Sequence, residues 1–153
     1  MTHLRGMVVD LKTSSQSGAG TDAHIYIGVV GTRGGREFPL DVEGFNDFEP
    51  GTDVKYWLGT VWDGTAITGS RKPRGSEPGG NNNPQRYRVQ LDDVQYVYIR
   101  KAAGLTEGSD DAYRLDEVEV MLYGYNPESR SFGTTRDMWL SIENGLQLWL
   151  PED

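Results

Sequence analysis

Glycine and proline interrupt this chain so often that a fold built on long helices is excluded. The 153 residues include 20 glycines and seven prolines, and no apolar pattern with the period of a helix continues for about ten residues or more. Short segments instead alternate apolar and polar residues or are rich in β-branched and aromatic residues, as β-strands are. Eight such segments occur, at residues 7–12, 23–30, 36–40, 54–58, 87–91, 94–101, 115–122 and 145–150. They predict an all-β fold, with eight short strands arranged as a β-sandwich.

The composition favours one folded domain spanning residues 1–153. Hydrophobic residues make up 36% of the chain and aromatic residues 10%, which is enough for a core at this length. The formal net charge of −8 disfavours nucleic acid as a partner, because proteins that bind its phosphates carry a basic surface. Without cysteine, the chain has no disulfide, no thiolate zinc site and no cysteine nucleophile.

The sequence also limits where the protein is expected to act. No run of about 18 apolar residues occurs, so we expect no transmembrane segment. The first residues, Met1-Thr2-His3-Leu4-Arg5, lack the apolar core of a secretory signal. We therefore expect a cytoplasmic protein, or an extracellular one if a leader has been removed. The oligomeric state is left open.

A glycine-rich loop runs directly into the second predicted strand. Gly18 and Gly20 allow backbone conformations that other residues avoid, including close approach to an ion, and Asp22 adds a carboxylate. Free carbonyls and a carboxylate fixed to a rigid strand are what an oxygen-liganded cation such as calcium needs. The alternative is a tight turn in which Asp22 hydrogen-bonds to its own backbone.

An acidic loop follows the third predicted strand. Residues 41–53 contain five acidic residues and no basic one, and carboxylates at this density repel one another unless a divalent cation relieves the repulsion. Hard oxygen ligands favour calcium over zinc, although the spacing is not that of an EF-hand. The alternative is a solvated acidic loop, which is our interpretation of Glu43 and Glu49. A third acidic cluster, Asp110-Asp111, would join the first two if the strand order brings it to the same end.

The segment at about residues 60–85 differs in composition from the rest of the chain, and we expect it to be a flexible insertion. It is rich in glycine, proline and asparagine and carries a small basic cluster of Arg71, Lys72 and Arg74. This cluster would contact an anionic headgroup or an acidic partner, or else would only keep a mobile loop soluble.

Apolar side chains in loops add candidates for contact with a membrane or a partner. Phe45, Trp62 and Leu105 lie in or beside loops, where they would either insert into a membrane or anchor the loop. Three further tryptophans lie in strand-like segments, and we expect them in the core; they are Trp57, Trp139 and Trp149.

The chain shows no catalytic motif, and we expect no enzymatic activity. Its two histidines are His3, near the N-terminus, and His24, on the polar side of a predicted strand. The motifs of serine hydrolases, zinc metalloproteases and P-loop proteins are absent. A carboxylate pair for glycoside hydrolysis is possible in so acidic a chain, but nothing marks one out.

Taken in order, these motifs resemble the PLAT domain. The matching stretches are Gly20-Thr21-Asp22-Ala23 with Ile25-Tyr26-Ile27, Asn46-Asp47-Phe48 with Gly51, Ile99-Arg100-Lys101, Asp111-Ala112-Tyr113 and Trp139-Leu140. PLAT domains occur in lipoxygenases, animal lipases, polycystins and the clostridial alpha-toxin phospholipase. The likeness is greatest to the calcium-dependent, membrane-binding C-terminal domain of alpha-toxin, and it covers about residues 4–150.

The resemblance implies a sandwich of two four-stranded antiparallel sheets that binds a lipid surface or a protein and has no catalysis of its own. In the alpha-toxin relatives, calcium lies between loops at one end of the sandwich and bridges to phospholipid headgroups. Carried over by motif, the candidate calcium ligands are Gly20, Thr21, Asp22, Asp41, Gly44, Asn46, Asp47, Asp111 and Ala112. The candidate contacts with a membrane or partner are Phe45, Trp62, Arg71, Lys72, Arg74 and Leu105.

Departures from the alpha-toxin pattern narrow these expectations. Gly18 and Val54 stand where the alpha-toxin pattern has aspartates. The acidic loop at residues 41–53, which we call the second loop, is one residue longer than in that pattern, and the glycine-rich loop before it is the first loop. The loop at 104–109 offers only Leu105 in place of aromatic residues, which predicts shallow insertion. We therefore expect a calcium-binding domain that attaches to a phospholipid membrane surface or a partner protein. The alternatives are a calcium-independent protein-interaction module, a carbohydrate-binding domain and a lipid-acting enzyme domain.

Overall fold

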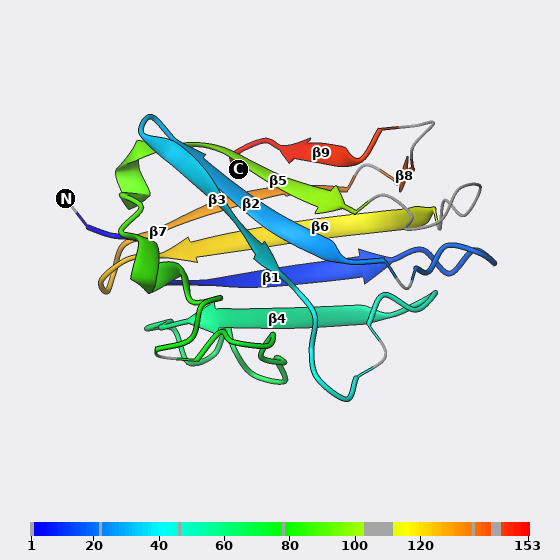
Figure 1. Cartoon of the computed structure of the whole chain (residues 1–153), viewed down its shortest axis with the longest axis horizontal. Helices are drawn as coiled ribbons and strands as arrows, with labels where there is room; N and C mark the ends of the chain where they lie inside the picture. The colour runs from blue at the N-terminus through cyan, green and yellow to red at the C-terminus, as the bar shows by residue number, and fades with distance from the viewer. Residues whose placement is uncertain are drawn as a thin grey trace.

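The computed structural model shows a β-sandwich of two antiparallel sheets (Figure 1). It describes residues 2–21, 23–45, 47–77, 79–102, 112–135, 137–141 and 145–153. The first sheet has the order β4(Asp53–Gly59), β1(Gly6–Thr13), β6(Tyr113–Tyr123), β7(Ser129–Thr134), and β8(Met138–Leu140) also pairs with β6. The second sheet has the order β3(Gly34–Pro39), β2(Ile25–Gly31), β5(Val94–Lys101), β9(Gln147–Leu150).

The predicted all-β sandwich is confirmed, but the two sheets hold five and four strands in the described part of the chain rather than four each. The eight predicted strands include neither β7 nor β8, although Trp139 of β8 was placed in a strand-like segment. Strand β7 has only one large apolar residue, Phe132, and β8 is three residues long. Both therefore lack the extended alternation of apolar and polar residues by which strands are identified.

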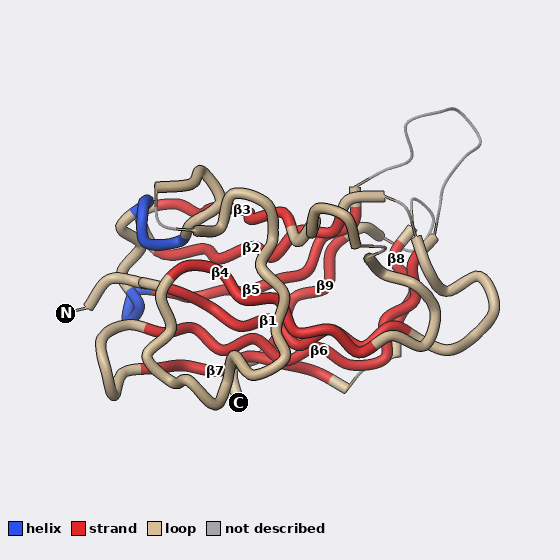
Figure 2. The backbone as a smooth tube through the Cα atoms, turned by 90° about the horizontal axis from the view of Figure 1, so that it is seen from below, coloured by secondary structure: helices blue, strands red, loops and turns tan. Residues whose placement is uncertain are grey.

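The segment at 87–91 was predicted as a strand and is not one. Pro84 opens a short 3₁₀ helix, η1(Pro84–Tyr87), and a second one, η2(Leu91–Asp93), follows. The side chain of Asn83 stabilises the start of η1 by accepting a hydrogen bond from the amide of Gln85 (3.0 Å). Figure 2 shows both helices at the end of the sandwich where the N-terminus lies. No described helix is long or apolar enough to cross a membrane.

Apolar side chains from the inner faces of both sheets form one core. In β1, Met7, Val9 and Leu11 are fully buried, while Asp10 between them is partly exposed. The same alternation follows β2, β5 and β6, whose inner residues are Ile25, Ile27, Val29, Val97, Ile99, Val118, Val120 and Leu122. Side chains of a strand point to opposite faces in turn, so this period of two separates the core from the surface.

One predicted core residue lies on the surface. The side chain of Trp149 is 51% exposed on the outer face of the second sheet, because Leu148 and Leu150 occupy the inward positions of β9. Its ring contacts Tyr96, which is also exposed, with 4.7 Å between the ring centroids. The expectation that Trp149 belongs to the core is therefore wrong, and Trp57 and Trp139, although partly buried, do not belong to the core cluster either.

The described residues of the segment 60–85 include a stretch that lies along the outer edge of β4. Arg71 forms a parallel bridge with Tyr56. The amide of Trp57 donates to the Arg71 carbonyl, and the amide of Arg71 donates to the Lys55 carbonyl, both over 2.8 Å. These bonds pair backbone groups of β4 that would otherwise be left open at the edge of the sheet.

Candidate calcium-binding end of the sandwich

Loops from both sheets meet at the end of the sandwich opposite the N-terminus (Figure 1). The amide of Thr21, in the loop after β1, donates to the carbonyl of Phe48, in the loop after β3 (3.1 Å). The amide of Arg114, at the start of β6, donates to the carbonyl of Ala19 (2.9 Å). The structure therefore brings Thr21 of the first loop against the second loop, and it ties the first loop to the strand that Ala112 precedes.

The contact between the first two loops requires glycine at position 20. A Cβ atom there would lie 2.7 Å from the carbonyl oxygen of Phe48 and 2.7 Å from Cδ of Pro50. Real Cβ atoms do not approach backbone atoms this closely. Gly20 therefore has a packing role in the structure, in addition to the ligand role predicted for it.

An aromatic cluster lies under these loops, and the sequence patterns do not identify it. The ring of Phe48 packs against Tyr56 and Tyr113, with centroid distances of 5.9 and 6.0 Å. Tyr113 also shares a 2.6 Å hydrogen bond with the hydroxyl of Thr13. Phe48 has a φ of 62°, a left-handed conformation that is rare for an aromatic residue. Its position within the Asn46-Asp47-Phe48 motif is the only signal in the sequence that points to it.

Asp47 is held inside the second loop. Its carboxylate accepts hydrogen bonds from the amide of Val42 (3.0 Å) and from the hydroxyl of Tyr56 (3.1 Å). Burial raises the pKa of the Asp47 carboxyl above its ordinary value, and these two hydrogen bonds oppose that rise. Burial also raises the pKa of Tyr56, and the Asp47 carboxylate adds to this effect. The predicted ligand Asp47 therefore braces the loop.

Asp41 forms an ion pair with Arg74, a basic residue in the segment that follows β4. Nε of Arg74 lies 3.3 Å from the Asp41 carboxylate, and the amide of Arg74 donates to the Asp41 carbonyl (2.8 Å). The two side chains are 60% and 40% exposed, for Arg74 and Asp41, so the ion pair lies at the surface. A carboxylate predicted to bind calcium thus has a cationic partner within the chain.

Thr21 and Gly44 occupy different environments at this end. The side chain of Thr21 is buried, and its hydroxyl oxygen accepts a hydrogen bond from the amide of Ala23 (3.0 Å). Gly44 is exposed in a turn with a φ of 73°, where other residues are strained. Asp22, Asn46, Asp111 and Leu105, which the motifs also mark as site residues, lie outside the described residues.

The donors at this end have the chemistry that calcium prefers, but the described ones do not complete a site. Calcium takes roughly six to eight oxygen ligands. Within the described residues, no group of three or more histidine or acidic side chains is placed to hold a metal ion. The carboxylates of Asp41 and Asp47 and the hydroxyl of Thr21 are suitable oxygens. The other predicted side-chain ligands, Asp22, Asn46 and Asp111, lie outside the described residues.

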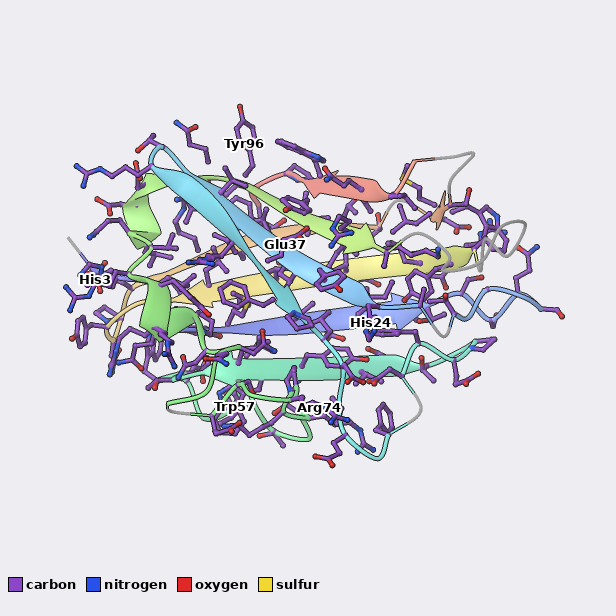
Figure 3. All side chains as sticks on the ribbon, viewed as in Figure 1. His3, His24, Glu37, Trp57, Arg74 and Tyr96 are labelled. Atoms are coloured by element: carbon purple, nitrogen blue, oxygen red, sulfur yellow. The ribbon has the colours of Figure 1, made fainter. Side chains whose placement is uncertain are left out.

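Most of the predicted membrane or partner contacts are gathered beside the second loop. The guanidinium of Arg71 lies 3.7 Å from the ring centroid of Phe45, and Nζ of Lys72 lies 4.0 Å from that of Trp57. Arg74 adjoins them through its pair with Asp41, and Figure 3 shows Trp57 and Arg74 along the same lower edge. We call Phe45, Arg71, Lys72 and Arg74 the basic edge.

Trp62 does not join the basic edge. Its ring packs edge-on against Tyr123, with 5.5 Å between centroids, and its indole N–H donates to the carbonyl of Glu128 (3.1 Å). Tyr123 ends β6 and pairs with Gly6, so Trp62 lies at the opposite end of the sandwich from Phe45. Trp62 therefore lies apart from Phe45, and Arg71 and Lys72 lie along the edge of β4.

The fold and this loop-bearing end define a β-sandwich of two antiparallel sheets in which polar loops lie together at one end. Residues 7–75 match the family model of the PLAT/LH2 domain, and the predicted resemblance to PLAT domains is confirmed. A search of curated proteins gives no match.

Solved structures share this fold over nearly the whole chain. Alpha-toxin from Clostridium absonum aligns with a TM-score of 0.63 at 22% identity, and alpha-toxin from an avian strain of Clostridium perfringens with 0.62 at 19%. Each alignment covers 97% of this chain and 31% of the toxin. Coral 8R-lipoxygenase, described as activated by calcium through a C2-like domain, aligns with a TM-score of 0.57 at 21% identity, covering 96% of this chain and 17% of the enzyme.

At these identities the comparisons establish the fold. The chain spans less than a third of the length of each of these proteins. PLAT is a non-catalytic domain, and the catalytic domains of these enzymes have no counterpart in this chain. Their activities therefore do not transfer to it, and the role of this domain is argued from its own residues.

Proposed function

We propose that this PLAT-like domain is a non-catalytic attachment module that binds calcium at the loop-bearing end and uses the ion to hold a phospholipid membrane surface or a partner protein. The observation that supports this most is the hydrogen bond from the Thr21 amide to the Phe48 carbonyl (3.1 Å), which joins the first two predicted ligand loops. The description of coral 8R-lipoxygenase as calcium-activated through a C2-like domain supports the choice of ion.

Calcium would be held by oxygen atoms from three loops. Side-chain oxygens would come from Thr21, Asp41, Asn46, Asp47 and Asp111, and backbone oxygens from Gly20, Gly44 and Ala112. Asp22 would bind the ion directly or brace the first loop. The bound ion would supply the positive charge that bridges these loops to an anionic group.

The environment of Asp47 supports a cation at this end. Burial raises the pKa of its carboxyl, and the nearby charge of Asp41 adds to the rise. Both effects disfavour the ionised form of Asp47. A divalent cation beside these two carboxylates would favour the ionised forms and remove the repulsion. Binding would therefore be coupled to the ionisation of Asp47.

Attachment would use the basic edge. The chain carries a net charge of −8, so a negatively charged surface is repelled unless a local positive field overcomes the repulsion. Arg71, Lys72 and Arg74, together with calcium, would provide that field, and Phe45 would provide the apolar contact. Trp62, at the opposite end, would not reach the same surface.

Thermal unfolding in calcium and in EDTA tests the proposed site. With free calcium at about 100 times its dissociation constant, one site adds about 2.7 kcal/mol to the stability. We expect Tm to rise in the unmodified protein and to rise less in Asp41→Asn. Glu119→Gln removes an acid outside this end and should keep the full rise. An unchanged Tm in EDTA and in millimolar calcium would refute the site.

Sedimentation with vesicles then identifies the attached surface. We expect the protein to pellet with vesicles that contain phosphatidylserine, in calcium and not in EDTA, and to stay in solution with phosphatidylcholine alone. Absence from the pellet in every condition, with a calcium-dependent Tm, would assign the calcium-bound end to a protein partner.

A calcium-independent protein-interaction module is the second candidate, and the pairing of Asp41 with Arg74 favours it. Arg74 already places a positive charge 3.3 Å from the carboxylate, and both oxygens of Asp47 have donors within the chain. The loops would then be held by these contacts alone. In that case, Tm is the same in calcium and EDTA, and partner binding is unaffected by EDTA.

A further inference from the structure

A hollow lined by charged residues lies at the end of the sandwich that carries the N-terminus. It has a volume of about 360 Å³ and lies between the tip of the β2–β3 hairpin and the segment joining η1 to η2, which adjoin each other in Figure 1. Arg33 and Arg36 line it from the hairpin, and Arg88 lines it from the segment. The proposed calcium site lies at the other end, so this hollow is separate from it.

These three arginines form no ion pair with any residue that the structure describes. Four other arginines have a carboxylate partner, in the pairs Arg74–Asp41, Arg100–Glu37, Arg114–Asp137 and Arg130–Glu152, whereas Arg5, Arg71 and Arg86 also form no ion pair within the described residues. The chain as a whole has 23 acidic and 15 basic residues, so partners are not scarce. A hollow in which positive charges outnumber negative ones attracts an anion.

The guanidinium of Arg36 is held in place by an aromatic ring. It lies over Tyr87, with 4.1 Å between Cζ and the ring centroid. Tyr87 is itself fixed, because its hydroxyl donates to the carbonyl of Asn81 (2.5 Å) and its ring packs against Phe38 (6.0 Å between centroids). Binding of a ligand by Arg36 therefore costs less side-chain conformational entropy than binding by a freely moving surface arginine.

Arg88 lines the hollow from an unusual backbone conformation. Its φ of 54° is in the left-handed region, which long side chains rarely adopt. The segment is secured just beyond this point, where the amide of Leu4 donates to the carbonyl of Val89 (2.6 Å). Gln90 also hydrogen-bonds to the ring of His3 (3.0 Å). Strained positions that the surrounding structure maintains are often found at binding sites.

One carboxylate, Asp93, also lines the hollow. It already accepts hydrogen bonds from the amide of Thr32 (3.1 Å) and from the hydroxyl of Thr32 (2.5 Å). These hydrogen bonds hold the Asp93 carboxylate to the hairpin turn. Three arginines and one carboxylate therefore line the hollow, so its formal charge is positive, although Asp92 lies with Arg33 and Asp93 in an adjoining hollow.

We propose that Arg33, Arg36 and Arg88 form a binding site for a phosphate monoester, carried by a small molecule or by a lipid headgroup. A guanidinium presents two parallel N–H donors that match a pair of phosphate oxygens. Three of them suit a terminal phosphate, which has three free oxygens and up to two negative charges. The volume of the hollow suits a small phosphorylated group.

Titration with glycerol 3-phosphate in EDTA tests the site directly. Amide chemical shifts of the ¹⁵N-labelled domain are followed, with sodium chloride at equal ionic strength as the reference. We expect saturable shifts at residues 31–36 and 87–93. Shifts that do not saturate, or that chloride reproduces, would overturn the proposal. This test uses the unmodified protein and so does not depend on whether a variant folds.

Charge variants locate the site. Arg36→Gln and Arg88→Asn should each weaken glycerol 3-phosphate at least about tenfold, because each removes a charged hydrogen-bonding group. Asparagine tolerates a positive φ and therefore suits position 88. Arg86→Gln is the matched control: Arg86 is also exposed and close in sequence, but it lies outside the hollow and donates to the carbonyl of Gly79. Equal weakening in Arg86→Gln would mean that only the overall charge matters.

Vesicles separate the two sources of phosphate. In EDTA, pelleting with phosphatidic acid and not with phosphatidylcholine, lost in Arg36→Gln and kept in Arg86→Gln, would assign a lipid headgroup. Saturable binding of glycerol 3-phosphate without pelleting would assign a small phosphorylated molecule. Binding of neither would overturn the proposal. Because EDTA removes calcium, failure of the proposed calcium site has no influence on these results.

Discussion

The hydroxyl of Tyr56 donates a hydrogen bond to the carboxylate of Asp47 over 3.1 Å. Tyr56 is a buried residue of β4, whereas Asp47 belongs to the acidic second loop, so this bond fastens the loop to the sandwich. The amide of Val42 completes the contact by donating to the other oxygen of the carboxylate (3.0 Å). A residue predicted as a calcium ligand is therefore also a structural brace, and a change at Asp47 would affect both roles.

Tyr56→Phe removes the hydrogen bond by which Asp47 braces the loop but leaves the Asp47 carboxylate in place as a predicted ligand. It should lower the free energy of unfolding by about 1–3 kcal/mol. The ring stays in the core, but one oxygen of Asp47 loses its donor. The pKa of Asp47 should rise further, because the lost hydrogen bond favours the ionised form. Urea unfolding at pH 7 measures the change. Tyr96→Phe is the control, since Tyr96 is exposed, and its effect should stay within about 0.5 kcal/mol. Equally small effects would contradict the role of the bond.

Gly28→Ala should destabilise the second sheet by about 1–3 kcal/mol. A Cβ atom at Gly28 would lie 2.1 Å from Cζ of Tyr98, whose ring crosses the glycine on the outer face. The ring cannot shift freely, because its hydroxyl donates to Glu37 (2.9 Å) and its face stacks on Trp149. Urea unfolding measures the loss. Figure 3 labels Glu37 on this face.

Gly64→Ala is the matched control for this substitution. Nothing lies within 4 Å of a Cβ atom at Gly64, so the change in stability should stay within about 0.5 kcal/mol. A double variant, Gly28→Ala with Tyr98→Ala, should lose less than the sum of the single changes, because the clash disappears with the ring. Additive losses would show that the crowding at Tyr98 is not the cause.

The strands could be predicted from the sequence because burial alternates along them. Met7, Val9 and Leu11 are fully buried in β1, as their spacing predicts. The same rule places Trp149 outward, since Leu148 and Leu150 flank it on the inner face. The general tendency of tryptophan to be buried led to the opposite expectation, and the local alternation was the better guide.

The site could be predicted only in part, because its contacts join distant parts of the chain. The meeting of the first and second loops follows from the sandwich arrangement, and the Thr21–Phe48 hydrogen bond confirms that these two loops meet. The pairing of Asp41 with Arg74 depends on how the segment after β4 runs along the sheet, and no local pattern records that path. The left-handed φ of Phe48 has no local signal either, since aromatic residues avoid that conformation.

The stability of the domain should fall as the pH rises from about 4 to about 7. Asp10 and Glu119 are paired neighbours on β1 and β6, at a small hollow on the outer face of the first sheet. Burial, reinforced by Asp53, raises the pKa of Asp10 to about 6, and burial, reinforced by Asp153, raises the pKa of Glu119 to about 7. The folded protein therefore retains protons that the unfolded chain has already released, and folding becomes less favourable across this interval.

Groups whose pKa is lowered on folding have the opposite sign but act at lower pH. Arg100 lowers the pKa of Glu37 and Arg130 lowers that of Glu152, and their contribution is complete above the unfolded value of about 4.3. Urea unfolding at pH 5 and pH 8 measures the net slope. Glu119→Gln should raise the stability at pH 8 and flatten the slope. Glu128→Gln, an exposed position in the turn after β6, should leave the slope unchanged. A stability that increases from pH 5 to pH 8 would contradict the expectation.

Arg74→Gln should tighten calcium binding if Asp41 is a ligand. Nε of Arg74 lies 3.3 Å from the carboxylate, so the guanidinium competes with the ion for the same oxygens. Because both side chains are substantially exposed, the stability in EDTA should change by less than about 1 kcal/mol. Calorimetric titration of calcium measures the affinity, which should rise severalfold in Arg74→Gln. In the background of Asp41→Asn the same substitution should have no such effect, because no carboxylate remains to be released. An affinity that Arg74→Gln leaves unchanged or weakens would remove Asp41 from the ligand set and favour the calcium-independent module.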